Sequence, residues 1–303
     1  MKVMITGGSG LLGLNWALHA RSRHDVAIVS HTRSVRMDGA VSLQWSLETP
    51  DSVRELCRNI GPQLIIHTVG YTNVDACQKD PDKAMHTNCK LAGQVAQVAK
   101  EVDAKLVHIS TDHLFDGSQS SVDETEPPSP INVYGHTKLS GEKLVRSVNP
   151  EALVVRTNFY GWGHRYRQSF TDWVLDSIAA RRKIDVFHDV YFTPILVDDL
   201  IESIEKLIEL GVSGVVNVVS DERISKYDFA RAIADEFHVS KDYIGRSSLS
   251  EGTFVAQRPA DMSLSNRKAT KLLGRSLGRA SRGLLRLKET AGRQNELNAI
   301  LID

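Results

Sequence analysis

The chain has 303 residues, of which 37 are basic and 37 acidic, so its formal net charge is zero. A chain of this length can bury a large core, and the balanced charge gives no sign of a nucleic-acid or membrane-surface partner. No apolar run is long enough to cross a bilayer, and the three cysteines lack the spacing of a disulfide framework or a zinc site. We therefore expect a cytoplasmic protein with reduced thiols and no bound metal.

The first expected strand, residues 2–5, runs directly into a glycine-rich turn, and a helical pattern begins at Leu11. Because the strand starts so early, no signal peptide fits before it. Gly7, Gly10 and Gly13 follow one another at intervals of three residues. Such a turn lets the backbone approach a pyrophosphate, which the free N–H groups of the helix N-terminus then bind. A turn without a ligand is the alternative, but the context of strand, turn and helix favours nucleotide binding.

The loop after the second expected strand, residues 26–30, is where a nucleotide-binding fold of this kind selects its cofactor. An acidic residue there binds the ribose hydroxyls of NAD and repels the 2′-phosphate of NADP. This chain instead has His31, Thr32 and Arg33, with Arg36 close behind. Positive charge and hydroxyl groups favour a 2′-phosphate. We expect NADP(H), with NAD(H) as the alternative; a solvated basic loop without a ligand is the other interpretation.

Strands alternate with helices along the first half of the chain. Strands are expected at residues 40–45, 64–67, 105–109 and 152–156, and helices at 11–21, 50–60, 81–102 and 134–146. This alternation predicts an α/β fold, a Rossmann-like doubly wound parallel sheet with right-handed crossovers. We expect residues 1–157, completed by about 184–220, to form the NADP(H)-binding domain, and residues 158–183 and 221–303 to form a smaller C-terminal substrate-binding lobe and tail.

The second half of the chain is less regular. Helices are expected at residues 168–180, 197–210, 226–237 and 266–272, and strands at 190–196 and 214–218. We expect the strand at 190–196 and the helix after it to return to the central sheet, with 214–218 as its last strand. The tail after Gly274 is rich in arginine, and we expect a solvated amphipathic helix or a partly disordered end.

Tyr134 and Lys138 lie four residues apart at the start of an expected helix, so their side chains share one face. A nearby ammonium favours the phenolate and lowers the pKa of the tyrosine, so the pair can exchange a proton with a carbonyl oxygen. Thr111 follows the strand before this helix, on the ligand side of the sheet, where its hydroxyl can bond a developing oxyanion. Each feature alone has ordinary structural uses, but their order along the chain favours catalysis by all three residues.

With these motifs the chain resembles the extended short-chain dehydrogenases/reductases, and among them the dTDP-4-dehydrorhamnose reductase family. The resemblance is carried by ITGGSGLLG, HTVGYTNVDACQKDPDKAMHTN, ISTDHLFDG, YGHTKLSGE, VVRTNFYGWG and RPADMSLSNRKATKLLG, and extends over residues 5 to about 274. It implies NADPH-dependent reduction of a 4-keto nucleotide sugar, with hydride delivered to the C4 ketone and Tyr134 as proton donor. Two alternatives remain open: a non-catalytic NADP-binding regulatory subunit like the methionine adenosyltransferase β subunit, and a nucleotide-sugar epimerase or dehydratase.

The resemblance also implies roles for individual residues. The cofactor would be bound by Gly7, Gly10, Leu11, Leu12, Gly13, His31, Thr32, Arg33, Thr68, Gly70, Tyr71, Asn88, Tyr134, Lys138 and Thr157. The substrate would be bound by Asp112, His113, Asn158, Phe159, Trp162 and Arg258, with Arg258 near its nucleotide portion. The family usually has tyrosine where this chain has His113, which leaves the identity of the sugar open. The oligomeric state is open too, a homodimer being one arrangement compatible with the sequence.

Overall fold

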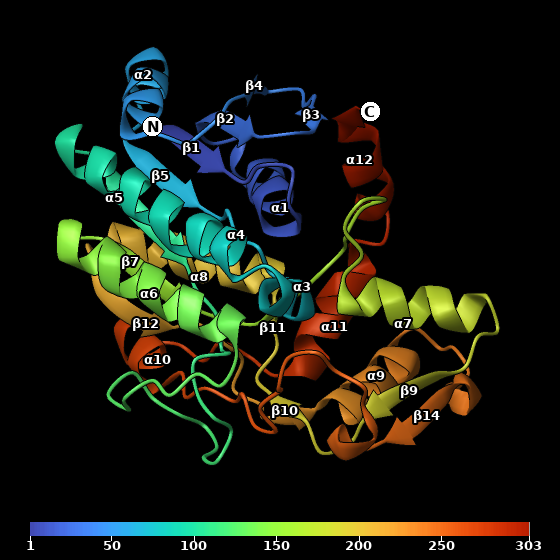
Figure 1. Cartoon of the computed structure of the whole chain (residues 1–303). Helices are drawn as coiled ribbons and strands as arrows, with labels where there is room; N and C mark the ends of the chain where they lie inside the picture. Colours follow the sequence, from blue (N-terminus) through green and yellow to red (C-terminus); the bar gives the residue numbers. More distant parts are fainter. Residues whose placement is uncertain (303) are drawn as a thin grey trace.

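The computed structural model describes residues 1–302, and parallel strands form its central sheet. From the N-terminus these strands are β1 (Lys2–Thr6), β2 (Asp25–Ser30), β4 (Ala40–Gln44), β5 (Leu64–His67), β6 (Lys105–Ile109), β7 (Leu153–Arg156) and β12 (Gly214–Asn217). They lie in the order β12–β7–β6–β5–β1–β2–β4, and every neighbouring pair runs parallel (Figure 1). The predicted Rossmann-like class is confirmed.

Helices cover both faces of this sheet. One face carries α1 (Leu11–Ala20) and α8 (Val197–Glu209), and the other carries α2 (Pro50–Ile60), α5 (Leu91–Glu101) and α6 (Val133–Val148). Side chains of β1 alternate between the two hydrophobic clusters, since Val3 and Ile5 pack with α1 and α8, and Met4 with α2 and α5. Because both faces are buried, the strands are continuous apolar runs that stand out in the sequence.

The helix predicted for residues 81–102 changes its winding part-way along. It consists of α4 (Pro81–Met85), a π-helical turn η1 (His86–Lys90) and α5, and it follows the short helix α3 (Val74–Lys79). Asp80 caps α4 as predicted, because its Oδ1 accepts a hydrogen bond from the N–H of Lys83 at 3.1 Å. Such π turns often occur at functional sites, and this one contains Asn88, whose side chain bonds the loop after β5.

A smaller group of elements lies beside the sheet (Figure 1). It contains α7 (Phe170–Ala179), α9 (Lys226–Glu236), β9 (Ile184–Phe187), β14 (Ile244–Ser247) and the single-turn helices η2 (Lys241–Tyr243) and η3 (Leu249–Glu251). β9 and β14 form a parallel pair of their own, and α7 packs on α9. β9 therefore does not complete the central sheet, although it falls in the range expected to do so. The domain boundaries themselves stay a prediction.

The prediction that residues 190–196 return to the central sheet is wrong. The segment is divided into β10 (Tyr191–Phe192), which pairs with β13 (Ile224–Ser225), and β11 (Ile195–Leu196), which pairs with β8 (Phe159–Tyr160). Pro194 lies between the two halves, and a proline has no N–H to donate to a continuous ladder. The strand expected at 214–218 does join the sheet, as β12 beside β7.

The C-terminal tail contains the predicted amphipathic helix, but it is packed against the rest of the chain, so the predicted solvation or partial disorder is wrong. α10 (Arg267–Leu273) comes before the tail, which contains α11 (Ala280–Glu289), α12 (Arg293–Ile300) and β15 (Leu301–Ile302). β15 pairs with β3 (Ser34–Val35). Acidic side chains of α8 neutralise the arginines, since Arg286 pairs with Asp199 and Glu202, and Arg293 with Asp198. The apolar side of the two longer helices is buried at Leu284, Leu287, Leu297 and Ile300.

Among residues 1–302, no helix is both long enough and apolar enough to span a membrane.

Candidate active site

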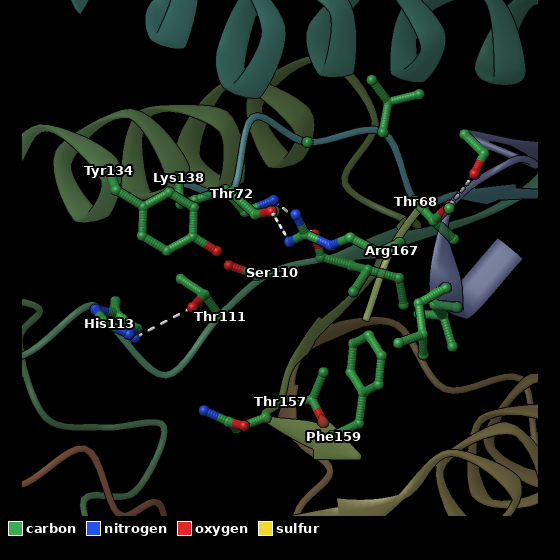
Figure 2. Close-up of a pocket in the computed structure, with 18 of the residues that line it drawn as sticks. Thr68, Thr72, Ser110, Thr111, His113, Tyr134, Lys138, Thr157, Phe159 and Arg167 are labelled. Carbon is green, nitrogen blue, oxygen red and sulfur yellow. Dashed lines mark hydrogen bonds between the residues drawn. The ribbon is translucent and has the colours of Figure 1, made fainter. Parts of the chain in front are cut away.

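A cavity of about 660 Å³ lies at the carboxyl ends of β1, β5, β6 and β7, where open α/β sheets bind their ligands. Its size is that of an ordinary small-molecule pocket. Figure 2 shows residues on its wall that come from segments far apart in the sequence. The predicted site residues among them are Gly7, Gly10, Leu11, Leu12, Arg33, Thr68, Gly70, Thr111, Asp112, His113, Tyr134, Lys138, Thr157, Asn158 and Phe159.

The turn predicted to bind pyrophosphate depends on glycine at two positions. Gly7 has a φ of +72°, and a Cβ atom there would lie 2.8 Å from Oγ1 of Thr68. A Cβ atom on Gly13 would lie 2.6 Å from the carbonyl oxygen of Gly7, so this residue lets α1 pack against the turn. Gly13 acts through this packing and is not among the wall residues, contrary to its predicted contact. Gly10 and Leu11 do line the cavity, so the free N–H groups and positive dipole end of α1 face it.

The loop predicted to select the cofactor contributes Arg33 to the cavity wall. The guanidinium carbon of Arg33 lies 4.7 Å from the centre of the Tyr166 ring, which lines the same cavity. His31 and Thr32 are exposed and lie off the wall within the described chain, so their predicted contacts with the cofactor are not supported. A long, flexible side chain reaches the cavity where its shorter neighbours do not.

Thr111, Tyr134 and Lys138, the residues predicted to be catalytic, lie together on the cavity wall (Figure 2). Burial raises the pKa of the Tyr134 phenol, and its hydrogen bond with Thr111 opposes this only in part. Burial also lowers the pKa of Lys138 to about 8. The Nζ of Lys138 donates a hydrogen bond to the carbonyl oxygen of Ile109 at 2.7 Å. The net pKa of Tyr134 is therefore raised and not lowered as predicted, because burial outweighs the effect of the neighbouring positive charge.

Neighbouring side chains hold the hydroxyl of Thr111. Its Oγ1 donates to Oδ1 of Asp112 at 3.2 Å and accepts a hydrogen bond from the N–H of His113 at 3.3 Å. The other carboxylate oxygen of Asp112 accepts a bond from Nδ2 of Asn158 at 2.6 Å. The His113 ring meets the Tyr134 ring edge-on with 5.4 Å between their centres, and burial lowers the pKa of His113, so this imidazole is neutral at neutral pH. These residues form one connected wall.

Asn88 and Tyr71 affect the cavity indirectly. Asn88 accepts a hydrogen bond from the N–H of Tyr71 at 2.7 Å, and its Nδ2 donates to the Tyr71 carbonyl at 3.1 Å and to Oγ1 of Thr137 at 3.0 Å. These bonds tie the loop after β5, which contains Thr68 and Gly70, to α6. Neither Asn88 nor Tyr71 is on the wall formed by the described residues, so a positioning role replaces their predicted cofactor contacts.

A buried ion pair supports α6 next to Tyr134 and Lys138. Glu142, one helical turn after Lys138, accepts hydrogen bonds from Nε and Nη2 of Arg156 on β7 at 3.1 and 2.8 Å. The two side chains are only 4% and 5% exposed. The negative charge of Glu142 opposes the lowering of the Lys138 pKa by burial. The pair therefore links the sheet to the charge state of Lys138.

A second cavity, of about 480 Å³, adjoins the first at Thr72, Val74 and His113. Its wall combines aromatic rings with cationic side chains, among them Phe170, Trp173, Phe187, Phe254, Lys226 and Arg258. Arg258 pairs with Asp75 at 3.1 Å. Arg258, which is predicted to meet the nucleotide portion of a substrate, therefore lines the second cavity and not the first, which contains Thr111, Tyr134 and Lys138.

Trp162, which is predicted to bind the substrate, is a packing residue instead. Its side chain is buried, and Nε1 donates a hydrogen bond to the carbonyl oxygen of Leu287 at 3.0 Å. The ring packs edge-on against Phe237, with 5.7 Å between the centres. Trp162 lies on neither cavity wall in the described chain. The sequence places Trp162 in a loop but does not show that the indole packs against the C-terminal tail, so the predicted substrate contact is wrong.

Comparison with known proteins decides the family. The model of the RmlD substrate binding domain matches residues 1–288. The chain belongs to this family. The RmlD-family chain is 31% identical over 265 residues to the probable low-salt glycan biosynthesis reductase of Haloferax volcanii, covering 86% of this chain and 88% of that protein. It is 29% identical to the methionine adenosyltransferase 2 subunit beta of Rattus norvegicus, covering 87% and 80%.

A solved structure agrees with this assignment. The dTDP-4-dehydrorhamnose reductase of Bacillus anthracis, crystallised in complex with NADP, matches the RmlD-family chain with a TM-score of 0.84 and 28% identity. The match covers 95% of this chain and 98% of the other. The resemblance found in the sequence motifs is confirmed.

The RmlD-family chain also has functional candidates that its sequence did not indicate. Nη2 of Arg167 donates a hydrogen bond to Oγ1 of Thr72 at 2.6 Å, and both residues line the first cavity (Figure 2). Nζ of Lys226 lies 3.4 Å from the centre of the Phe192 ring and 5.5 Å from that of Phe170. Burial lowers the pKa of Lys226 to about 8. Neither cation belongs to a motif of fixed spacing, so only the tertiary structure reveals them.

Proposed function

We propose that this chain is an NADPH-dependent reductase that converts the 4-keto group of a nucleotide sugar to an alcohol. The observation that carries the proposal is a single cavity that combines the glycine turn of α1 with Thr111, Tyr134 and Lys138. The names of its relatives support it, since the Haloferax volcanii protein is a probable reductase and the Bacillus anthracis structure is a reductase in complex with NADP.

The residues on the cavity wall fit a phosphorylated dinucleotide. The N-terminus of α1 would hold the pyrophosphate, and Arg33 would hold the 2′-phosphate, which favours NADP(H) over NAD(H). Lys138 would hold the nicotinamide ribose, with Thr157 and Phe159 beside the ring. Bound NADPH supplies the hydride that the C4 carbon of the ketone receives.

Residues of the protein supply the proton and stabilise the negative charge that develops on the ketone oxygen. Tyr134 is a protonated phenol at neutral pH because burial raises its pKa, so it donates the proton to the oxygen that becomes the alcohol. The hydroxyl of Thr111 donates to Asp112 in the resting structure, and by turning its hydrogen to the substrate it would bond the same oxygen as negative charge develops. Lys138 is charged below about pH 8 and stabilises the phenolate that remains on Tyr134. Carbon gains one hydride and oxygen one proton.

The second cavity is the proposed place of the nucleotide portion of the substrate. Its aromatic rings can stack on a base, and Arg258 and Lys226 can bind a diphosphate. Because the two cavities meet at His113, a sugar bound between them would have its ketone beside Tyr134. We place the enzyme in the cytoplasm, which the three buried free thiols support. A homodimer is the proposed assembly, on the resemblance alone.

The proposal is tested by following NADPH oxidation with dTDP-4-dehydrorhamnose and with UDP-linked 4-keto sugars. We expect turnover with at least one of them, dependent on the enzyme and far slower in the Tyr134→Phe variant. Tyr134→Phe removes only the hydroxyl and keeps the ring that packs against His113. As a control, the affinity of this variant for NADPH should be unchanged. Full activity in this variant would remove the proton-donor role.

A regulatory subunit is the second candidate, and the similarity to the rat methionine adenosyltransferase subunit favours it. It predicts NADPH binding without turnover on any 4-keto sugar, together with stable association with a synthetase chain. An epimerase or dehydratase would instead retain its cofactor through purification and show no net oxidation of NADPH.

A further inference from the structure

The end of the chain adds a segment beyond the family match. The family model stops at residue 288, whereas α12 and β15 cover residues 293–302. In Figure 1 this segment, in dark red, lies next to β3, on the side of the molecule that carries α1. The contacts of this segment join two loops that are far apart in the sequence.

One side of the segment binds the loop that carries Arg33. β15 pairs with β3 in antiparallel fashion, with Leu301 opposite Val35, directly after the cofactor loop. The N–H of Arg36 donates a further hydrogen bond to the carbonyl oxygen of Ile300 at 2.8 Å. The backbone on the C-terminal side of Arg33 is therefore held by main-chain hydrogen bonds to the tail.

The other side of the segment binds the loop that contains Tyr166, whose ring contacts Arg33. Oδ1 of Asn298 accepts a hydrogen bond from the N–H of Arg165 at 2.6 Å. Tyr166, the next residue, provides the ring against which the Arg33 guanidinium lies at 4.7 Å. Nε2 of Gln294 donates to Asp172 at 3.1 Å, and the same carboxylate accepts the N–H groups of that loop at Gly163 and Ser169.

The segment itself is anchored to the body of the protein. Leu297 is fully buried and Ile300 is 6% exposed. Glu296 pairs with Arg21 at 2.6 Å, and Arg293 pairs with Asp198 of α8. A helix fixed in this way can restrain the two loops that it touches.

We propose that residues 293–302 form a strap that positions Arg33 and Tyr166 for the 2′-phosphate of NADPH. This inference rests on the proposed function, because it assumes that NADPH occupies the first cavity. An arginine held in place loses less conformational freedom when it binds an anion than a mobile one does. NADH has no 2′-phosphate, so the strap raises the affinity for NADPH selectively.

The test compares two asparagines of the same helix. Asn298→Ala removes the acceptor for the Arg165 N–H, whereas Asn295→Ala changes an exposed residue of α12 and serves as the matched control. Asn298→Asp keeps an acceptor and should restore binding. The readouts are the Kd values for NADPH and NADH, measured by fluorescence titration, and the Tm of each variant.

We expect Asn298→Ala to weaken NADPH binding by up to about 10-fold and to leave NADH binding unchanged. This factor corresponds to the conformational entropy that one arginine side chain loses when it is fixed. Removal of residues 293–303 should lower the NADPH preference at least as much; if this truncation does not fold, Asn298→Ala decides. An unchanged ratio of the two Kd values, or an equal loss for both cofactors, would overturn the strap. A wild-type chain that binds neither nucleotide would instead refute the proposed function itself.

Discussion

The ammonium group of Lys138 donates a hydrogen bond to the carbonyl oxygen of Ile109, with 2.7 Å between the two atoms. This bond fixes the lysine on the cavity wall at the end of β6, two residues before Thr111. The positive charge is thus held close to Tyr134 without a hydrogen bond to it. We infer that the charge of Lys138 stabilises the phenolate left on Tyr134 after proton transfer, although burial keeps the net pKa of the phenol raised.

The charge of Lys138 gives a pH dependence whose direction is set by its pKa. The group is protonated below about pH 8 and neutral above it, so stabilisation of the phenolate is lost as the pH rises through that value. We expect kcat for ketone reduction to fall on the alkaline side with an apparent pKa of about 8. Lys138→Met should lower kcat by about 100-fold and remove this alkaline limb. A pH profile of the variant parallel to that of the wild type would contradict the assignment.

Arg33 should decide between the two nicotinamide cofactors. A charge-assisted hydrogen bond contributes about 1.5–3 kcal/mol, so Arg33→Met should weaken NADPH binding by about 10- to 100-fold and leave NADH binding nearly unchanged. Arg36→Met is the matched control, because Arg36 is exposed in the same loop and off the cavity wall. Titration of both cofactors into both variants measures the effect. Equal losses in the two variants would indicate general electrostatics instead of a phosphate contact.

Glu142 should matter for stability as well as for Lys138. Glu142→Gln leaves the buried guanidinium of Arg156 without its counter-charge, and breaking a buried pair costs about 3–5 kcal/mol. Urea unfolding, compared with the wild type, measures the loss. The double variant Glu142→Met with Arg156→Met should recover much of it, because both charges are then absent. A loss below about 1 kcal/mol would show that the pair is effectively solvated.

Lys226 should affect the substrate and not the cofactor. Its ammonium lies over the Phe192 ring on the wall of the second cavity, where it can meet an anionic group of the substrate. We expect Lys226→Met to raise KM for the nucleotide sugar by about 10-fold or more, with the Kd for NADPH unchanged. Lys241→Met, which removes an ion-paired lysine from the same group of elements, is the control. Unchanged KM would leave Lys226 a purely structural residue.

The central sheet and most of the site could be predicted because local pattern and tertiary structure agree there. Strands buried on both faces are uninterrupted apolar runs, and helix caps such as Asp80 act within a few residues. The cavity follows from topology, since the carboxyl ends of parallel strands share one edge. Thr111, Tyr134 and Lys138 therefore meet as their order along the chain indicates.

The remaining features depend on contacts between distant segments. Arg167 lines the cavity but lies in a loop that has no recognisable motif. Trp162 packs against the C-terminal tail, which the sequence predicts to be solvated. The pKa of Tyr134 depends on burial, which the spacing to Lys138 does not reveal. In each case the deciding neighbour lies far away in the sequence.

The most direct test of the account is the fate of a labelled hydride. The purified chain is incubated with a 4-keto nucleotide sugar and NADPH that carries deuterium at both C4 positions of the nicotinamide, and the product is analysed by NMR. The account predicts deuterium at C4 of the sugar, in step with NADPH oxidation, and almost no product from Tyr134→Phe. Deuterium at another sugar carbon, or a sugar that remains unlabelled while NADPH is bound, would contradict it.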